Sequence, residues 1–360
     1  MAWKKLLTCT AVAVSLLTAP AFIPNAGAEK MRKVNFRLAW IPSGQYCYAL
    51  VARKLGFWRK LGLDVKIHRG FGSSKTSQEI STGQFDVGEA SFGPAILVIS
   101  KGGSLVGMGA RYQKSPMGVA TLKKTPLKTA KDIEGLRLAS SPGSGSHTLF
   151  PAFARSAGID ANKIKWLMIS PAAYHASLLA GKVDAVSTYI VSFAPGLIGR
   201  GVKYNFVFYA DNGLDMLDQT FWARPDRLKK DRNLYRKFVQ GALKGISHTF
   251  LEPEDSIKIT MGELPIYGKG KQSRKIIEAG LGVASAISSS AHTEKNGIGW
   301  MEPSLVKDSL DRVVKYMGAA PIKDINSIYT NEFIGGEKLT PAQWKKMRDW
   351  SMKFLPSSYR

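Results

Sequence analysis

The sequence has very little cysteine. Of its 360 residues only two are cysteines, Cys9 and Cys47. Cys9 lies in a segment that we expect to be removed, so the mature chain would keep Cys47 alone and could form no intrachain disulfide. No histidine lies near Cys47 in the sequence, which favours a small helix residue over a nucleophile at this position. The core is therefore expected to hold by packing alone.

Histidine is scarce too, and no catalytic motif stands out. The five histidines are His68, His147, His175, His248 and His292. No two of them have the spacing of a zinc site, and the cysteines do not form a ligand pair. A G-x-S-x-G nucleophile elbow is absent. We expect no metal, no cofactor and no catalytic residues, and we predict that the protein is not an enzyme.

Acidic residues are few relative to basic ones. The chain has 27 Asp and Glu against 51 Lys and Arg, which gives a net charge of +24. Removing Lys4 and Lys5 with the leader leaves +22. The basic residues are scattered along the chain and no nucleic-acid motif appears, so nucleic acid is not an expected partner. A positive field favours anionic solutes and anionic membrane surfaces.

The one long apolar run lies at the N-terminus. Lys4 and Lys5 precede an uncharged apolar stretch that extends to about Ile23, and Ala26-Gly27-Ala28 is a small-x-small site. This pattern predicts a signal peptide over residues 1–28, cleaved after Ala28. Because Cys9 stands at the start of the apolar run, a lipoprotein is not expected. We predict a periplasmic protein with a mature chain of 360 − 28 = 332 residues.

What the chain does contain is a repeated strand–loop–helix rhythm. A mostly apolar strand is predicted over 34–40, followed by a loop at 41–44 and a helix over 46–55. Further strands are predicted over 62–67, 85–90 and 105–110, with helices between them. This order indicates a parallel sheet with right-handed crossovers.

A second series of similar plan follows. Strands are predicted over 118–122, 136–140, 164–169, 183–188 and 204–209. A return strand over 219–223 leads into a mostly helical C-terminal region. The fold class is therefore α/β, with two lobes, two hinge strands and parallel sheets covered by helices on both faces. Lobe 1 would comprise 29–116 and 219–360 with the C-terminal helices, and lobe 2 would comprise 117–218.

Serines mark several loops at the carboxyl ends of predicted strands, where ligands bind in open α/β sheets. The clearest is Ser140-Ser141-Pro142-Gly143-Ser144-Gly145-Ser146, and Ser73-Ser74 and Ser91 repeat the pattern. Unpaired N–H groups at a helix start suit an anionic oxygen. A capped helix with a glycine turn remains the alternative for the first loop, and a core position remains the alternative for Trp40.

The order of several short motifs resembles a known family. The motifs are Trp40-x-Pro42, Ala52-x-x-x-Gly56-Phe57-Trp58, Gly62-Leu63-Asp64-Val65, Gly83-x-x-Asp86-Val87, Lys131-Asp132-Ile133-Glu134-Gly135, Ala180-Gly181-x-Val183-Asp184-Ala185, Ala223-Arg224-Pro225-Asp226, Gly299-Trp300-Met301-Glu302-Pro303 and Tyr329-Thr330-Asn331-Glu332-Phe333. Together they resemble the solute-binding proteins of ABC importers for nitrate, sulfonates, taurine and thiamine-pyrimidine precursors. The resemblance implies a type II periplasmic-binding-protein fold that closes on its ligand.

The resemblance also implies site residues. Trp40, Ser73, Ser91, Ser144 and Tyr189 fall on loops that line the cleft in such relatives. Pyrimidine-precursor relatives carry His where this chain has Tyr46, and a pyrimidine synthase of this kind would need a cysteine-rich motif and an active His. Neither is present, and these departures argue against both a pyrimidine ligand and the enzyme.

From these observations we expect a monomeric protein that captures a small anionic solute such as a sulfonate, taurine or nitrate and delivers it to an ABC permease. The alternatives are a pyrimidine precursor or other aromatic heterocycle, a periplasmic enzyme on the same scaffold, and a sensor partner. The expected ligand-binding residues are Trp40, Tyr46, Ser73, Ser74, Ser91, Phe92, Met117, Ser144, Gly145, Ser146, Tyr189 and Asp215. Asp215 would suit an amine such as taurine, or would be an exposed loop carboxylate.

Overall fold

The computed structural model describes residues 1, 31–268 and 270–356. The predicted signal peptide and its cleavage point after Ala28 lie outside the described residues, apart from Met1. Residues Met31–Arg360 form one compact unit, and the description below concerns that unit. Within its described part, no helix combines the length and the apolar character needed to cross a bilayer.

The first sheet has five strands in the order β2-β1-β3-β10-β4. Its central parallel pairs join β1 to β2 and to β3, with Val34 opposite Val65 and Phe36 opposite Val87. Strand β10 lies between β3 and β4 and is antiparallel to both. The strands are β1 (Arg32–Arg37), β2 (Leu63–His68), β3 (Val87–Ala90), β4 (Val106–Tyr112) and β10 (Asp218–Ala223).

The second sheet also has five strands, in the order β7-β6-β8-β5-β9. Strands β6, β7 and β8 are parallel, whereas β5 is antiparallel to β8 and β9. The strands are β5 (Met117–Leu122), β6 (Arg137–Ser140), β7 (Lys165–Met168), β8 (Ala185–Tyr189) and β9 (Tyr204–Phe208). All five lie between β4 and β10 in the sequence, so the chain crosses between the sheets twice.

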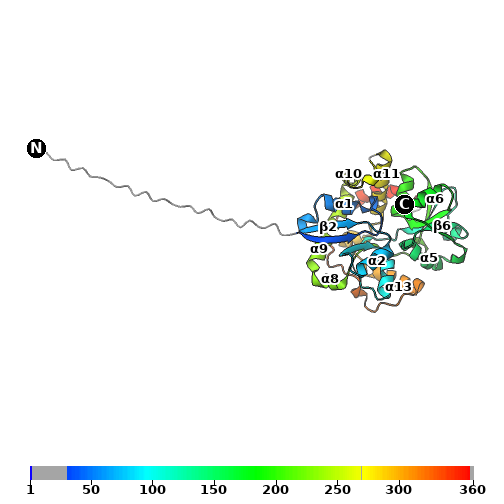
Figure 1. Ribbon diagram of the computed structural model, residues 1–360, viewed down its shortest axis with the longest axis horizontal. Coiled ribbons are helices and arrows are strands. Elements are labelled where there is room, and N and C mark those ends of the chain that lie inside the picture. Colours follow the sequence, from blue (N-terminus) through cyan, green and yellow to red (C-terminus); the bar gives the residue numbers. More distant parts are fainter. Residues whose placement is uncertain (2–30, 269, 357–360) are drawn as a thin grey trace. The chain divides into compact units, whose positions relative to one another are not determined.

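Helices cover both sheets. Figure 1 shows α1, α2, α8 and α9 around the first sheet, and α5 and α6 beside β6 of the second. The helices before β10 are α1 (Cys47–Lys54), α2 (Ser73–Ser81), α3 (Phe92–Ser100), α4 (Gly145–Thr148), α5 (Phe150–Ala157), α6 (Tyr174–Leu179) and α7 (Ile190–Ile198). Those after it are α8 (Pro225–Lys230), α9 (Arg232–Leu251), α10 (Pro253–Glu263), α11 (Lys271–Ala286), α12 (Ala291–Asn296), α13 (Pro303–Met317) and α14 (Pro341–Ser351).

The C-terminal helices contact both halves of the molecule. Helix α9 packs along α1, whereas α11 packs against α7 and α13 packs against α5 as well as α3. Val283 and Ile287 accordingly share a buried cluster with Phe193 and Phe208. The α/β, two-lobed fold class is confirmed, and the C-terminal region fastens the two sheets to each other.

Three details of the predicted fold are corrected by the structure. The sheets are mixed rather than wholly parallel, because the two strands that follow the crossings, β5 and β10, enter from the opposite direction. The opening strand ends at Arg37, so Trp40 lies in the loop beyond it. Helix α7 was not predicted; Pro195 and Gly196 in its interior are poor helix formers that hid it.

Candidate functional site

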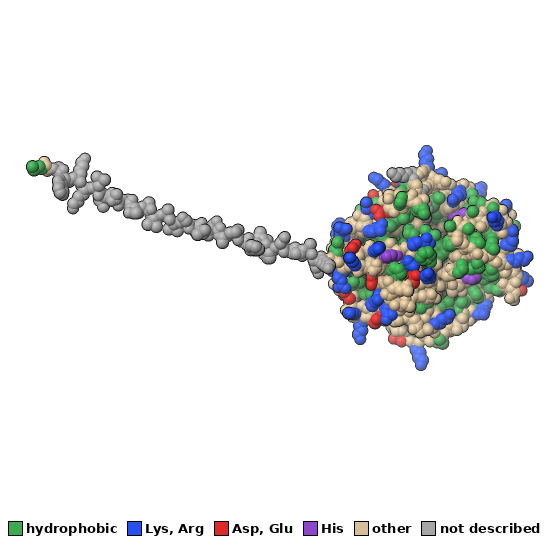
Figure 2. Space-filling view, viewed as in Figure 1, with side chains coloured by type: hydrophobic (Ala, Val, Ile, Leu, Met, Phe, Trp, Pro, Cys, Tyr) green, Lys and Arg blue, Asp and Glu red, His purple; other side chains and the backbone are tan. Residues whose placement is uncertain are grey.

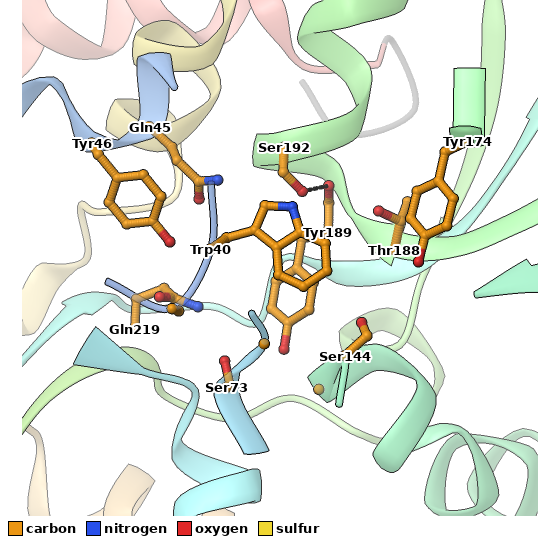
Figure 3. A pocket seen from close by; sticks show the side chains of 13 residues that line it. Trp40, Gln45, Tyr46, Ser73, Ser144, Tyr174, Thr188, Tyr189, Ser192 and Gln219 are labelled. Atoms are coloured by element: carbon orange, nitrogen blue, oxygen red, sulfur yellow. Dashed lines mark hydrogen bonds between the residues drawn. The ribbon is translucent and has the colours of Figure 1, made fainter. Parts of the chain in front are cut away.

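The loops of the two sheets enclose a small space that we call the inner cavity. Figure 3 shows Trp40 at its centre, with Gln45, Tyr46 and Gln219 on one side and Tyr174 and Thr188 on the other. The lining residues are Ala39, Trp40, Gln45, Tyr46, Gly72, Ser73, Ser144, Gly145, Tyr174, Thr188, Tyr189, Ser192 and Gln219. Four of them are aromatic and none carries a formal charge.

Strand ends position these side chains. Trp40 follows β1, Ser73 opens α2 after β2, Ser144 precedes α4 after β6, and Tyr189 ends β8. The carboxyl ends of parallel strands share one edge of a sheet, so the loop tips of both sheets meet there. The cavity therefore occupies the crevice that the strand–loop–helix pattern predicts.

The two halves are in contact around the cavity. Gly72 has φ = +117°, and a Cβ atom there would overlap the carbonyl oxygen of Gly143 in the other half. The hydroxyls of Ser74 and Thr148 lie 3.0 Å apart, which joins α2 to α4. The enclosed volume is about 20 Å³, room for about one water molecule. The structure thus describes a closed arrangement, which a larger guest could enter only when the halves separate.

A hydrogen-bonded relay leads from the cavity wall to a buried acid. The hydroxyl of Ser91 donates to Asp218 Oδ1 over 2.7 Å and lies 2.8 Å from the hydroxyl of Tyr189. Because Ser91 has one proton to give, Tyr189 is the donor in the second contact. Ser115, between the two sheets, donates to Asp218 Oδ2 over 3.4 Å. Burial raises the pKa of Asp218 to about 7.

Next to Asp218, Gln219 holds an uncommon backbone conformation. Its φ of +46° makes it the one non-glycine residue with positive φ in the described chain. Its side-chain amide donates to Ser91 Oγ over 3.1 Å, while its own amide oxygen is buried without a hydrogen-bond partner among the described residues. A strained residue with an unpaired acceptor at a cavity wall is typical of a ligand contact.

A buried ion pair supports the other wall. Arg111 and Glu89 are almost fully buried and lie 2.6 Å apart, and the hydroxyl of Tyr48 donates to Glu89. Arg111 also donates to the backbone carbonyl of Gln45 over 2.8 Å. Burial raises the pKa of Glu89 although Arg111 opposes the shift. The pair thereby fixes the segment that presents Gln45 and Tyr46 to the cavity.

Trp40 also borders two larger spaces. The outer cavity, of about 440 Å³, is lined by Trp40, Ile41, Arg69, Phe71, Lys75, Ser141, Pro142, Met168, Ile169, Ser170 and Pro171. The side cavity, of about 390 Å³, includes Trp40, Ser43, His175, Arg200, Gln272 and Ile276 among its lining residues. The partly buried Trp40 thus stands where the three spaces meet.

The structure brings together six of the twelve expected site residues. Trp40, Tyr46, Ser73, Ser144, Gly145 and Tyr189 line the inner cavity. Ser91 lies one hydrogen bond behind Ser73 and Tyr189.

The remaining residues do not line the inner cavity. Phe92 and Met117 are fully buried in the core. Ser146 is also buried, and its hydroxyl forms a hydrogen bond with that of Ser144. Ser74 faces Thr148, and Asp215 accepts a hydrogen bond from the backbone N–H of Ser115. Asp215 is not an exposed loop carboxylate, since burial raises its pKa.

Seven lining residues were missed by sequence reasoning, namely Ala39, Gln45, Gly72, Tyr174, Thr188, Ser192 and Gln219. Ala39 and Gly72 are neighbours of expected residues and could have been found by extending the loops. Tyr174 follows a short 3-10 turn, and Gln219 depends on strand β10 lying inside the first sheet. No sequence signal marks either position.

Within the described residues, no three His, Cys, Asp or Glu side chains gather as metal ligands. Burial raises the pKa of Cys47 to about 12, so its thiol stays protonated. A role for Cys47 as a nucleophile therefore has no support in the structure.

Comparison with known proteins agrees with this architecture. The riboflavin-binding protein RibY of Chloroflexus aurantiacus is 22% identical over 357 residues, covering 92% of this chain and 95% of the relative. The periplasmic aliphatic sulphonate binding protein SsuA of Escherichia coli superimposes with a TM-score of 0.62 at 17% identity, covering 86% of this chain and 95% of that one. The alkanesulfonate-binding protein SsuA of Xanthomonas axonopodis pv. citri, bound to MOPS, gives a TM-score of 0.62 at 14% identity, covering 83% and 98%. These likenesses establish the periplasmic-binding-protein fold.

The family follows from the chain itself. The NMT1/THI5 like family model matches residues 44–256, more than half of the sequence and the whole of the strand–loop–helix region from Gly44 to α10. The chain belongs to the NMT1/THI5 like family.

Proposed function

We propose that the protein is the solute-binding component of an ABC importer and that its inner cavity takes the ring of an aromatic heterocycle. The observation that carries this is the lining: four aromatic side chains, Trp40, Tyr46, Tyr174 and Tyr189, and no charged group. Aromatic walls suit planar ring systems. The amides and hydroxyls of Gln45, Gln219 and Ser192 would bond the polar edges of such a ring.

This lining favours the heterocycle over the sulfonate or nitrate that we expected first. A desolvated anion needs positive charge or several N–H donors. The inner cavity offers no Lys or Arg, although the first residues or N-caps of α2, α4 and α7 line it. The riboflavin ligand named for RibY supports a heterocycle here, because that relative aligns along nearly the whole chain.

Ligand capture would work by closure. The two crossing segments, 113–116 and 209–217, would act as the hinge, and lobe 1 (29–116 and 219–360) would move against lobe 2 (117–218). A ring does not fit the inner cavity of about 20 Å³, so the two halves would close around it less tightly than they do in this structure. A guest that contacts both walls still favours closure over opening. The closed form would then dock on a permease in the inner membrane.

A thermal-shift screen tests the ligand class. The mature chain would be heated with riboflavin, a hydroxymethylpyrimidine, taurine, MOPS and nitrate. A true ligand at about 100 times its Kd adds roughly 2.7 kcal/mol to the free energy of unfolding. We expect a shift with at least one heterocycle. Stabilisation by taurine, MOPS or nitrate with none by a heterocycle would favour the anion reading instead.

A further inference from the structure

The outer cavity carries positive charge that the fold does not use. Arg69 and Lys75 line it, and no Asp or Glu does. Within the described residues neither cation forms a salt bridge. Arg69 donates a 3.4 Å hydrogen bond to the carbonyl of Gly70 and lies over the ring of Phe71. Both side chains are exposed, and both face the space of the outer cavity.

The lack of a partner for Lys75 has a structural cause. Glu79 lies four residues further along α2, the spacing at which a helix pairs opposite charges. Both carboxylate oxygens of Glu79 are already engaged by Arg37, at 2.7 and 2.8 Å, and both side chains are about 90% buried. Lys75 is exposed, lines the outer cavity and lies 5.3 Å from the ring of Phe71.

The opposite wall comes from the second sheet and is polar. Ser141 and Ser170 lie in the loops after β6 and β7, and both line the outer cavity. The hydroxyl of Ser141 is buried and has no hydrogen-bond partner among the described residues. An anionic group placed here would receive cations from one half and hydroxyl donors from the other.

From this arrangement we propose that the outer cavity is an anion subsite, formed by Arg69 and Lys75 with Ser141, for a phosphate or similar anionic tail of the solute whose ring occupies the inner cavity. This rests on the proposed function. Trp40 borders both spaces, so a ring at Trp40 can extend a substituent into the outer one. The volume of about 440 Å³ accommodates such a group.

The side cavity is the less suitable place for the tail. Its cation, Arg200, donates over 2.6 Å to the carbonyl of Gly196 in α7, the helix that precedes it. Part of its hydrogen-bonding capacity is thus already used. The outer cavity instead has two cations, and an anion between the halves there would stabilise closure as well as binding.

The test uses ligand pairs that differ by one phosphate: riboflavin with flavin mononucleotide, and hydroxymethylpyrimidine with its phosphate. Affinities would be measured by calorimetry. We expect the phosphorylated member of a bound pair to bind about tenfold tighter or more. In the Arg69→Gln/Lys75→Gln variant the ratio of the two affinities should fall toward one.

The control is Lys229→Gln/Lys230→Gln, which removes the same charge from exposed positions on α8. This control variant should keep the ratio of the two affinities that the unmodified protein shows. Equal affinities for both members in the unmodified protein, or equal loss of the ratio in both variants, would overturn the anion subsite while leaving a bound ring in place. If only MOPS or taurine binds, the ring assignment fails; the anion subsite then stands if Arg69→Gln/Lys75→Gln weakens that binding tenfold, and falls if it does not.

Discussion

The hydroxyl of Tyr189, at the end of β8, lies 2.8 Å from that of Ser91, at the start of α3. One residue belongs to the second sheet and the other to the first, so this contact exists only when the two halves are together. Tyr189 also lines the inner cavity. This hydrogen bond therefore links a residue of the cavity wall to the other half of the protein, and it should stabilise the closed arrangement.

Tyr189→Phe keeps the ring and removes this cross-sheet hydrogen bond. A neutral hydrogen bond contributes about 0.5–1.5 kcal/mol, so we expect ligand affinity to fall about three- to tenfold. Calorimetry with the best ligand of the thermal-shift screen measures the change. Tyr235→Phe, in α9 and remote from the cavity, is the matched control. Equal losses in both variants would refute a role for the contact in closure.

Asp218 should make stability depend on pH in an unusual direction. Burial raises its pKa from 3.8 to about 7, so between about pH 4 and pH 7 the folded protein keeps a proton that the unfolded chain releases. The free energy of unfolding must then decrease as pH rises through this window, by at most about 1.4 kcal/mol per pH unit, and level off above it.

Asp218→Asn removes the titrating group, and its unfolding free energy should lose that decrease. Urea denaturation at a series of pH values measures both proteins. The comparison concerns the slope, because the substitution also alters hydrogen bonds to Ser91 and Ser115. The same slope in both proteins would show that Asp218 does not titrate in this range.

Removing one partner of the buried Arg111–Glu89 pair should lower the free energy of unfolding more than replacing both partners with uncharged residues. Arg111→Met leaves a buried carboxylate without its cation, and we expect a loss of about 3–5 kcal/mol in the free energy of unfolding. Arg111→Met/Glu89→Gln removes both charges and should recover part of that loss. Urea denaturation distinguishes the two variants. A double variant as unstable as the single one would contradict the assignment of the cost to an unpaired charge.

Cys47 should be unreactive in the folded protein. It is fully buried in α1 and its pKa is raised to about 12, so almost no thiolate exists at neutral pH. In a preparation that starts at Glu29, we expect a thiol reagent to label one site only after unfolding. Rapid labelling under native conditions would contradict the burial of this side chain.

The sequence predicts the architecture well because the strand–loop–helix order is local. Strands such as β2 and β8, and the loop serines 73 and 144, follow from apolar patterns and turn residues nearby in the chain. The features that the sequence does not predict depend on contacts between residues far apart in the chain. The place of β10 between β3 and β4 is fixed by the return crossing, and it alone brings Gln219 to the cavity wall and Asp218 behind it.

The same limit explains the expected site residues that the cavity does not include. Phe92 and Met117 sit at strand ends or helix starts as predicted, but their side chains point into the core. Sequence pattern assigns a residue to a loop; it does not assign the face on which its side chain lies. The basic residues show the same limit. Figure 2 shows Lys and Arg spread over the visible face, and neither their number nor their distribution tells which of them are unpaired.

The central claim is that Trp40 and its aromatic neighbours hold the ring of a heterocyclic solute. Calorimetric titration of the mature chain and of Trp40→Ala, with riboflavin and a hydroxymethylpyrimidine, tests it most directly, and Trp350→Ala on α14 serves as the control. We expect one of these heterocycles to bind and its affinity to fall about 30-fold in Trp40→Ala, the effect of losing a central aromatic contact of about 2 kcal/mol. Equal affinities in Trp40→Ala and the unmodified protein, or heat from aliphatic sulfonates alone, would contradict it.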